Sequence, residues 1–358
     1  MIARTPFGCL PDGRETMLYE LSAGGVTVRV CDFGATLQAV LAPDRDGKPA
    51  DIVLGYGDVA GYCGENAACY GATIGPVANR TDRGEVPIAG SVHQLPKNDG
   101  PARENNLHSD LARGLHKRLW NAEADEAANA VRFTCTLVDG ELGLPGNRTF
   151  TAAYALAQDA RGGASLTLTY RCATDTETYV NMTNHAYFNL AGHASGTVLG
   201  QLARVEASRY LPIRADSVST GEVRDVTGTP FDFRAAKPLG RDIDADDEQL
   251  HRARGYDHCL CIDGYARDAA PRSALHVEDA GSGRALDIQI TAPGAHLYTG
   301  NWLDDAHAKD GAAYAPHSGF AFEPEFWPDS VHHDAWEHPV CAPGHPFRTT
   351  IVYRFSTC

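Results

Sequence analysis

Glu323 is the most conspicuous candidate for proton chemistry in this chain. It lies in the apolar segment 319–324 (Gly-Phe-Ala-Phe-Glu-Pro), where the proline is expected to end strand pairing. A carboxylate buried without a partner is costly. A charge in such a segment is therefore expected to be either paired or functional.

Three further segments place histidines or carboxylates beside polar or aromatic residues. His185 stands in Thr-Asn-His-Ala-Tyr-Phe-Asn-Leu (183–190), and His108 follows a polar loop in Asn-Leu-His (106–108). Asp257 lies between an aromatic residue and His258. A lone histidine usually has a structural role, so each segment alone is weak evidence for function.

Two clusters that suggest metal ligands fail on their spacing. The acidic run 242–248 would put Asp247 at the sixth position of a calcium loop, which needs Gly, and Ala253 at the twelfth, which needs Glu. We interpret that run as a solvated helix start. A second group matches neither zinc-protease spacing: His332, His333, Glu337 and His338. We predict that neither cluster binds a metal.

Amino-acid composition disfavours some classes of partner and some cellular locations. Lys and Arg number 31 and Asp and Glu 46, and the resulting net charge of −15 disfavours nucleic acid and anionic membranes as partners. The 10 cysteines contain no CxxC pair, which favours a reducing compartment, and we interpret Cys259 and Cys261 as core residues. Without an apolar leader or a membrane-length apolar run, the expected location is the cytoplasm.

Alternation of apolar and polar residues is the main structural signal. Strands are predicted around 26–30, 166–170 and 286–290, and the turn clusters between such segments are spaced like hairpins. Short helices are predicted at 59–69 and 246–253. With no repeat and no linker-like stretch, the pattern favours one all-β, mostly antiparallel sandwich domain over 1–358.

Taken together, the polar segments resemble the aldose 1-epimerase, or galactose mutarotase, family. The most specific stretch is Thr-Asn-His-x-Tyr-Phe-Asn-Leu at 183–190, and the resemblance covers nearly the whole chain. The other matching stretches, in chain order, are 71–75 with 78–80, 106–108, 139–147, 220–222, 229–233, 255–258, 298–301, and Glu323 with 327–329.

The resemblance implies a large antiparallel β-supersandwich with an open, polar sugar cleft and no metal or organic cofactor. Glu323 matches the family's general base and His185 its general acid; we expect a nearby carboxylate to keep His185 protonated near neutral pH. Opening a cyclic sugar requires removing the C1 hydroxyl proton while protonating the ring oxygen. The positions expected to bind the sugar are Asn79, Arg80, His108, Asp257 and His296.

Five residues depart from the family's usual pattern beside the expected site. Pro76 stands where Arg is often found, Ser109-Asp110 replaces Gly-Gly, and His296 and Glu325 each replace Gln. Since both expected reacting groups are present, we expect these changes to affect the choice of sugar more than the reaction.

Three functions remain open from the sequence. The favoured one is a mutarotase for free aldoses, acting as a monomer or homodimer. The alternatives are a hexose-6-phosphate 1-epimerase, which would call for extra basic residues at the cleft, and a non-catalytic sugar-binding protein, which would need neither Glu323 nor His185.

Overall fold

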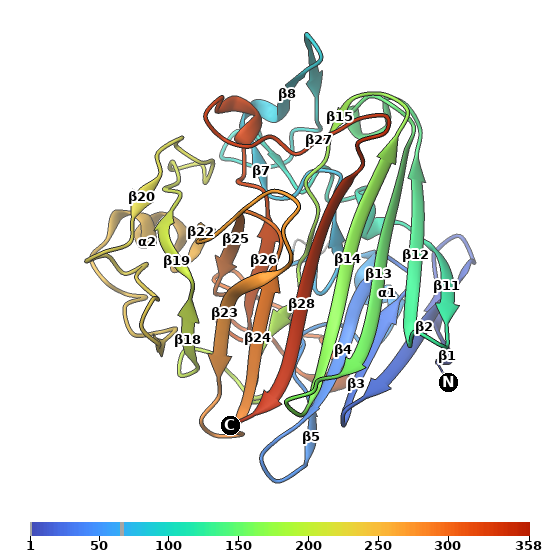
Figure 1. Cartoon of the computed structure of the whole chain (residues 1–358), viewed down its shortest axis with the longest axis vertical. Coiled ribbons are helices and arrows are strands. Elements are labelled where there is room, and N and C mark those ends of the chain that lie inside the picture. Colours follow the sequence, from blue (N-terminus) through green and yellow to red (C-terminus); the bar gives the residue numbers. More distant parts are fainter. Residues whose placement is uncertain (1, 65–67) are drawn as a thin grey trace.

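The computed structural model describes residues 2–64 and 68–358, which fold mainly into antiparallel strands (Figure 1). The broad face in Figure 1 is a nine-stranded sheet. Its strands, in spatial order, are β11 (Asn121–Asp125), β12 (Ala130–Leu137), β13 (Arg148–Gln158), β14 (Ala164–Thr174), β28 (Phe347–Thr357), β24 (Arg284–Ile290), β23 (Arg272–Glu278), β18 (Leu202–Val205) and β21 (Lys237–Pro238).

A five-stranded meander from the N-terminal part of the chain contacts this sheet through β2 and β4. Its strands are β1 (Ala3–Cys9), β2 (Glu15–Ala23), β3 (Val26–Cys31), β4 (Thr36–Pro43) and β5 (Pro49–Asp51). A six-stranded sheet carries the polar segments. It contains β17 (Tyr187–Phe188), β26 (Phe320–Glu325), β25 (Gly294–Tyr298), β22 (Asp257–Ile262), β19 (Ala207–Tyr210) and β20 (Arg224–Asp225).

Short ladders complete the framework around the six-stranded sheet. They pair β6 (Thr73–Ile74) with β16 (Thr183–Asn184), β7 (Arg80–Thr81) with β10 (Asn106–Leu107), β8 (Glu85–Ile88) with β9 (Ser91–Gln94), and β15 (Thr178–Tyr179) with β27 (Val340–Cys341). The β6–β16 ladder ties the first third of the chain to its middle, and the β15–β27 ladder ties the middle to a segment near the C-terminus.

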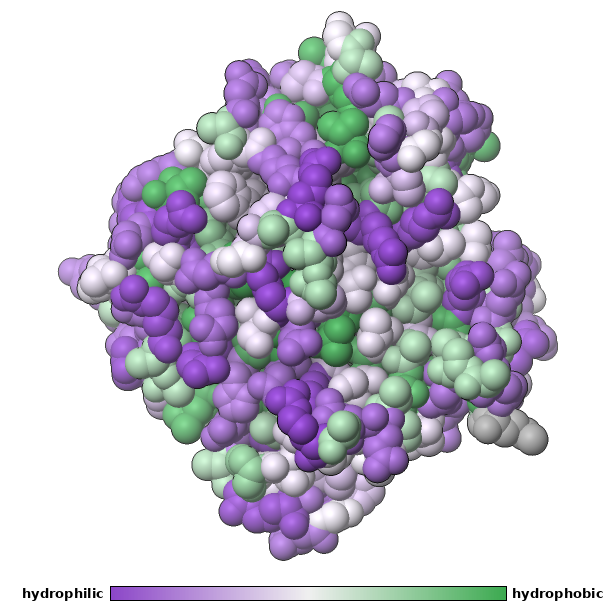
Figure 2. Space-filling model, viewed as in Figure 1, coloured by the Kyte–Doolittle hydropathy of each residue, from purple (hydrophilic) through white to green (hydrophobic). Residues whose placement is uncertain are grey.

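One large apolar cluster joins the three sheets. It takes alternate residues from each of them, including Val28 of β3, Leu168 of β14, and Leu297 and Phe322 of the six-stranded sheet. Burying such side chains is the dominant favourable term in folding. The outer face of the nine-stranded sheet carries interspersed hydrophilic and hydrophobic residues (Figure 2).

The predicted strands at 26–30, 166–170 and 286–290 are confirmed as parts of β3, β14 and β24. The helix predicted at 59–69 is shorter: α1 (Val59–Cys63) ends where Gly64 turns to extended backbone. The last part of that prediction falls partly on residues 65–67, which lie outside the described residues. No helix in the described part of the chain is both long and apolar enough to span a membrane.

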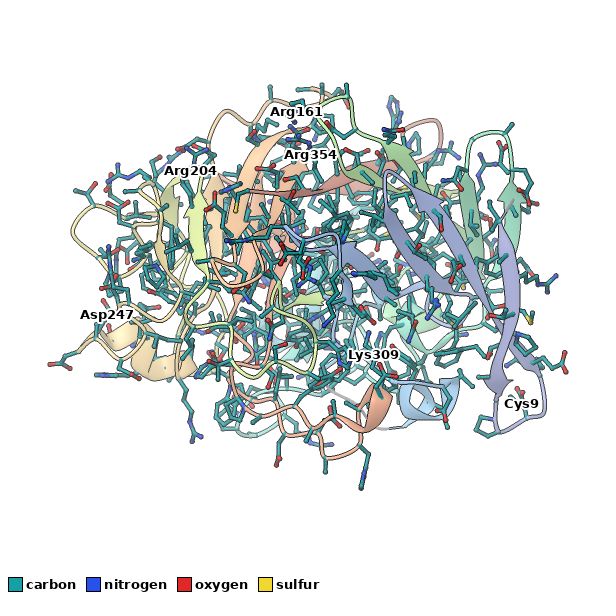
Figure 3. All side chains as sticks on the ribbon, turned by 90° about the horizontal axis from the view of Figure 1, so that it is seen from below. Cys9, Arg161, Arg204, Asp247, Lys309 and Arg354 are labelled. Atoms are coloured by element: carbon teal, nitrogen blue, oxygen red, sulfur yellow. The ribbon has the colours of Figure 1, made fainter. Side chains whose placement is uncertain are left out.

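The acidic run forms a helix start, as interpreted from the sequence. The carboxylate of Asp247 accepts the N–H groups of Gln249 and Leu250 and so caps α2 (Glu248–Ala253), near the edge of the molecule in Figure 3. Cys259 and Cys261 are buried free thiols in a small apolar cluster with Leu211.

The expectation that Pro324 ends strand pairing is wrong. Strand β26 continues to Glu325, and Pro324 pairs with Ala295 of β25. The neighbouring strand β17 pairs with β26 only at Phe320 and Ala321. Beyond that point β26 has a named strand partner on one side, where a residue without an N–H is tolerated.

Candidate active site

The alternation of three adjacent strands gathers the polar residues on one face of the six-stranded sheet. His296 of β25 lies opposite both Glu323 of β26 and Cys259 of β22. Residues two apart in a strand share a face, so this face also carries Asp257, Tyr298 and Glu325. The residues between them point into the core, as Leu297 and Phe322 do.

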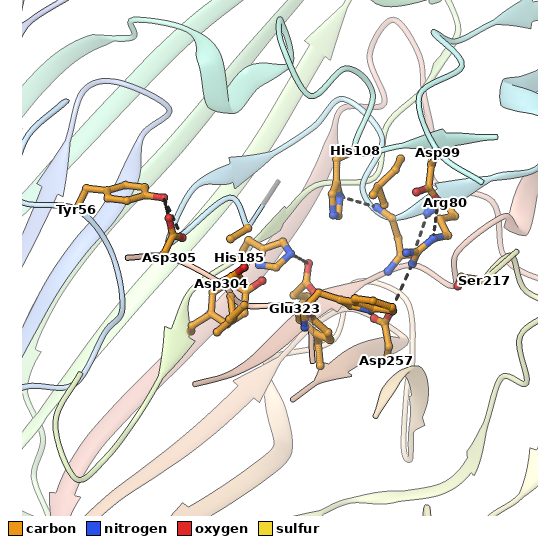
Figure 4. Close-up of a pocket in the computed structure, with 17 residues that line it drawn as sticks. Tyr56, Arg80, Asp99, His108, His185, Ser217, Asp257, Asp304, Asp305 and Glu323 are labelled. Atoms are coloured by element: carbon orange, nitrogen blue, oxygen red, sulfur yellow. Dashed lines mark hydrogen bonds and ion pairs between the residues drawn. The ribbon is translucent and has the colours of Figure 1, made fainter. Parts of the chain in front are cut away.

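A cavity of about 530 Å³ opens over this polar face (Figure 4). Its walls bring together segments that lie far apart in the sequence. The lining residues are Tyr56, Ala68, Asn79, Arg80, Asp99, Leu107, His108, His185, Tyr187, Ser217, Asp257, Tyr298, Trp302, Leu303, Asp304, Asp305 and Glu323. The volume and the polar lining suit a small hydroxylated ligand.

His185 is held by backbone contacts on both sides. Its N–H donates to the carbonyl of Ala72 (3.0 Å), and its carbonyl accepts the N–H of Gly71 (2.9 Å). Gly71 has a φ of +64°, and a Cβ there would lie 2.0 Å from the Leu37 carbonyl oxygen. The side chain of Asn184 also donates to the Gly71 carbonyl (2.8 Å). The Asn-His pair of the 183–190 stretch thus fixes the imidazole over the cavity.

Asn79 and His108 are locked together by two reciprocal contacts. The His108 N–H donates to the Asn79 carbonyl (3.1 Å), and the Asn79 N–H donates to His108 Nδ1 (3.1 Å). Burial lowers the pKa of His108 well below its usual value. A neutral ring that accepts at Nδ1 carries its proton on Nε2, so His108 can offer an N–H to a ligand.

Arg80 lies between two carboxylates of the cavity wall. Its Nε donates to Asp99 (2.8 Å), and its Nη1 lies 3.7 Å from Asp257 Oδ2. Burial opposes the charge of Arg80, but Asp257 and Asp99 outweigh it and raise its pKa. The guanidinium is thereby fixed in one orientation.

Glu323 and His185 face each other at the base of the cavity. Glu323 Oε2 and His185 Nε2 are 3.6 Å apart, and both side chains are almost fully buried. Burial raises the pKa of Glu323 and lowers that of His185 to about 3. The expectation that the carboxylate keeps His185 protonated is therefore wrong for the free protein, because burial outweighs the nearby carboxylates and keeps the imidazole neutral.

Two atoms of this pair have unused hydrogen-bonding capacity. Among the described residues, neither Glu323 Oε2 nor His185 Nδ1 has a hydrogen-bond partner. Buried polar groups are normally paired, so unpaired atoms at the base of a cavity indicate contact with a ligand or water. A sugar offers several hydroxyl groups for such contacts.

A metal ion is a weaker explanation of the same cluster. One potential ligand atom from each of His108, His185 and Glu323 lies within 4.8 Å of the others. However, Nε2 of His108 carries the proton, because Nδ1 accepts the Asn79 N–H. A protonated nitrogen has no lone pair to offer a metal, so the donor set suits proton transfer and hydroxyl binding better.

His296 does not line the cavity, unlike the other sugar-binding residues predicted from the sequence. The cavity is lined by Asn79, Arg80, His108 and Asp257, whereas His296 is not among its lining residues. Its Nε2 atom is 2.8 Å from Asp257 Oδ1. Direct contact with a sugar is therefore not supported, because the ring is already packed against protein groups on both sides.

The other departures from the family pattern also lie outside the lining. Ser109 has a φ of +63°, the left-handed conformation that glycine adopts most easily, and its Oγ bonds both the N–H and the carbonyl of Val77. Asp110 pairs with Arg113, and Pro76 and Glu325 are buried beside the site. None of these side chains is placed to select a sugar by direct contact.

Asp99, Tyr298 and Asp305 were not predicted as site residues. Asp99 stands in a turn-like segment, and only the fold shows that it holds Arg80. Asp305 accepts hydrogen bonds from Tyr56 Oη (3.0 Å) and Tyr70 Oη (2.7 Å). No local sequence signal marks the contacts of Asp305, since its partners are more than 200 residues away.

Comparison with known proteins agrees with this geometry. The model of the aldose 1-epimerase family matches residues 17–354. Human galactose mutarotase is 36% identical over 357 residues, covering 99% of this chain and 98% of the relative. Aldose 1-epimerase from Escherichia coli K12 is 34% identical over 358 residues, covering 99% of both.

Solved structures show the same fold. An aldose epimerase homologue from C. elegans superposes with a TM-score of 0.84 at 29% identity, over 96% of this chain and 99% of that one. Galactose 1-epimerase from Lactobacillus acidophilus superposes with a TM-score of 0.82 at 24% identity, over 100% and 99% of the two chains. The chain belongs to the aldose 1-epimerase family.

Proposed function

We propose that this protein is a mutarotase that interconverts the α and β anomers of free aldoses. The observation that carries the proposal is the buried pair Glu323–His185, with unpaired polar atoms at the base of a sugar-sized cavity. The names of the relatives, galactose mutarotase and aldose 1-epimerase, support the same reaction.

The pair can supply both proton transfers that ring opening needs. In the proposed reaction, Glu323 as carboxylate takes the proton of the C1 hydroxyl and His185 as imidazolium protonates the ring oxygen. Hydroxyl groups of the bound sugar that donate to Glu323 favour its ionised form, which moves the shared proton to His185. After rotation about the C1–C2 bond, the reverse transfers close the other anomer.

The remaining lining residues are proposed to hold the sugar. Arg80, fixed by Asp99, and His108, which presents an N–H, can donate to sugar oxygens, while Asp257 can accept from a hydroxyl. We propose that residues 1–358 act as one catalytic domain, because the family model spans nearly the whole chain. A cytoplasmic monomer or homodimer remains our proposal; the 10 free cysteines are compatible with that location.

The charge of the cavity argues against a sugar phosphate. Its lining includes five acidic side chains, and Asp99 and Asp257 already engage Arg80. The other three are Asp304, Asp305 and Glu323. A phosphate dianion would meet this negative field without a free guanidinium to bind it.

The test is polarimetry on freshly dissolved α-galactose, α-glucose and glucose 6-phosphate. We expect the protein to accelerate the change in optical rotation of the free sugars, with a kcat/KM for the phosphate at least about tenfold lower. Preference for the phosphate would indicate the alternative epimerase. Sugar binding by calorimetry without acceleration would indicate a binding protein.

A further inference from the structure

A second charged pair, His296 and Glu325, lies beneath the reacting pair. His296 Nδ1 is 3.6 Å from Glu325 Oε1, and the two side chains are 4% and 0% exposed. On its other side His296 contacts Asp257 Oδ1 (2.8 Å). Asn79 Nδ2 lies 3.2 Å from Glu325 Oε1 and 3.0 Å from His296 Nδ1.

The register of the strands couples this pair to Glu323. His296 is the direct cross-strand partner of Glu323, and Glu325 follows two residues later on the same face of β26. Both charges are buried, so their fields at Glu323 are screened little by solvent. A buried charge whose partner is removed is strongly unfavourable, which makes the two side chains mutually dependent.

We propose that His296 and Glu325 are positioning residues: a buried imidazole–carboxyl pair that sets the proton affinity of the Glu323–His185 pair. They occupy two of the positions at which this sequence departs from the family's usual glutamines. The inference rests on the proposed function, because it takes Glu323 and His185 as the reacting groups.

The charges of His296 and Glu325 act on the pKa of Glu323 in opposite directions. The positive charge of His296 lowers the pKa of Glu323, and the negative charge of Glu325 raises it. Burial alone would lower the pKa of His296, but its contacts with Asp257 and Glu325 outweigh burial and raise it to about 10. The imidazole is thus charged at neutral pH. Burial raises the pKa of Glu325, and its contacts with His296 and Asn79 act against that rise.

Other titratable groups face the same space as the two pairs. Asp257, from β22, is held ionised: burial opposes its charge, but His296 and Arg80 lower its pKa. Further titratable neighbours are Cys259 and His258 of β22, Tyr298 of β25, Tyr187 of β17, Arg80 of β7, His108 after β10, Cys69, Tyr179 of β15 and Tyr353 of β28.

The experiment compares the pH profiles of kcat/KM for galactose in His296→Gln, Glu325→Gln and the double variant. Removing the cation makes every proton on the reacting pair harder to lose, so the profile of His296→Gln should move to higher pH by about one unit or more. Removing the anion should move the profile of Glu325→Gln to lower pH. The double variant should lie between the two, near the wild type.

A surface pair of the same residue types provides the matched control. His276 Nε2 contacts Glu278 Oε1 at 2.8 Å, with side chains 30% and 38% exposed. We expect His276→Gln and Glu278→Gln to leave the profile within about 0.2 pH unit, because exposed charges are screened. Circular dichroism at each pH confirms that every variant is folded.

Opposite shifts in the two single variants would support the proposal. Shifts in the same direction would overturn it, as would the absence of a shift in His296→Gln, expected if His296 is neutral and accepts from Asn79. NMR titration of the His185 imidazole gives a readout that needs no activity: its pKa should rise in His296→Gln. Loss of the proposed function would appear separately, as an inactive wild type.

Discussion

The hairpin β13–β14 and the polar face of β22, β25 and β26 follow the same alternation of side chains but bury different chemistry. In the hairpin, the inward positions are apolar or aromatic residues such as Leu168 and Tyr154. On the polar face, the alternate positions carry Asp257, His296 and Glu323. The same pleated strand geometry therefore forms an apolar core in one region and a reactive site in the other. Function depends on which face of the sheet carries charged residues.

The two regions also differ in where the groups that contact their side chains come from. The hairpin is stabilised by neighbours in the adjacent strands and the apolar core. The polar face depends on groups from segments outside its own sheet, including Arg80, Asp99 and His185. Changes in the first region should therefore affect stability, and changes in the second should affect catalysis.

The largest effect is expected from Glu323→Gln. Removing one member of a positioned acid–base pair should lower kcat by about 10² to 10⁴, measured by polarimetry. The thermal midpoint should not fall, because the variant removes a buried ionisable group and leaves the shape nearly unchanged. An unchanged kcat in the folded variant would remove Glu323 from the mechanism.

Leu168→Ala tests the apolar hairpin β13–β14. Leu168 is fully buried in β14, and the cavity left by truncation should lower the free energy of unfolding by about 2–5 kcal/mol. Below the unfolding transition, kcat should stay near the wild-type value. Urea denaturation with parallel rate measurements checks this, and a selective loss of kcat would show that the two regions are not separable.

The strands of the apolar sheets could be predicted from the sequence, whereas several contacts of the polar site could not. Strands β3, β14 and β24 were predicted because their patterns are local. The contacts of Asp99 and Asp305 could not be predicted, since the partners come together only through the sheet topology. The continuation of β26 through Pro324 was also not predicted. A proline is tolerated there because the neighbouring strand β17 ends before it, which the sequence does not show.

Asp99→Asn should have a smaller effect, on binding. Arg80 would lose its 2.8 Å charged partner and with it part of its fixed orientation. We expect KM for galactose to rise by about tenfold, a loss comparable with one hydrogen bond to a charged group, with a smaller change in kcat. Initial rates over a range of galactose concentrations separate the two constants, and a fall confined to kcat would contradict a binding role.

Ser109→Gly should have the smallest effect. Glycine removes the strain of a positive φ but also loses the two contacts of Ser109 with Val77. These terms oppose each other, so the free energy of unfolding should change by about 1 kcal/mol or less. The ratio of kcat/KM for galactose and glucose should not change, whereas a clear change in that ratio would restore a direct role in sugar choice.

The most direct test of the central claim is the pH dependence of kcat/KM for the wild-type protein. If Glu323 and His185 share one proton in the active form, activity should fall at low pH as a second proton binds and at high pH as the last one is lost. Because burial raises the pKa of Glu323, the alkaline limb should lie well above the usual range of a glutamic acid. A rate independent of pH throughout the folded range would contradict the account.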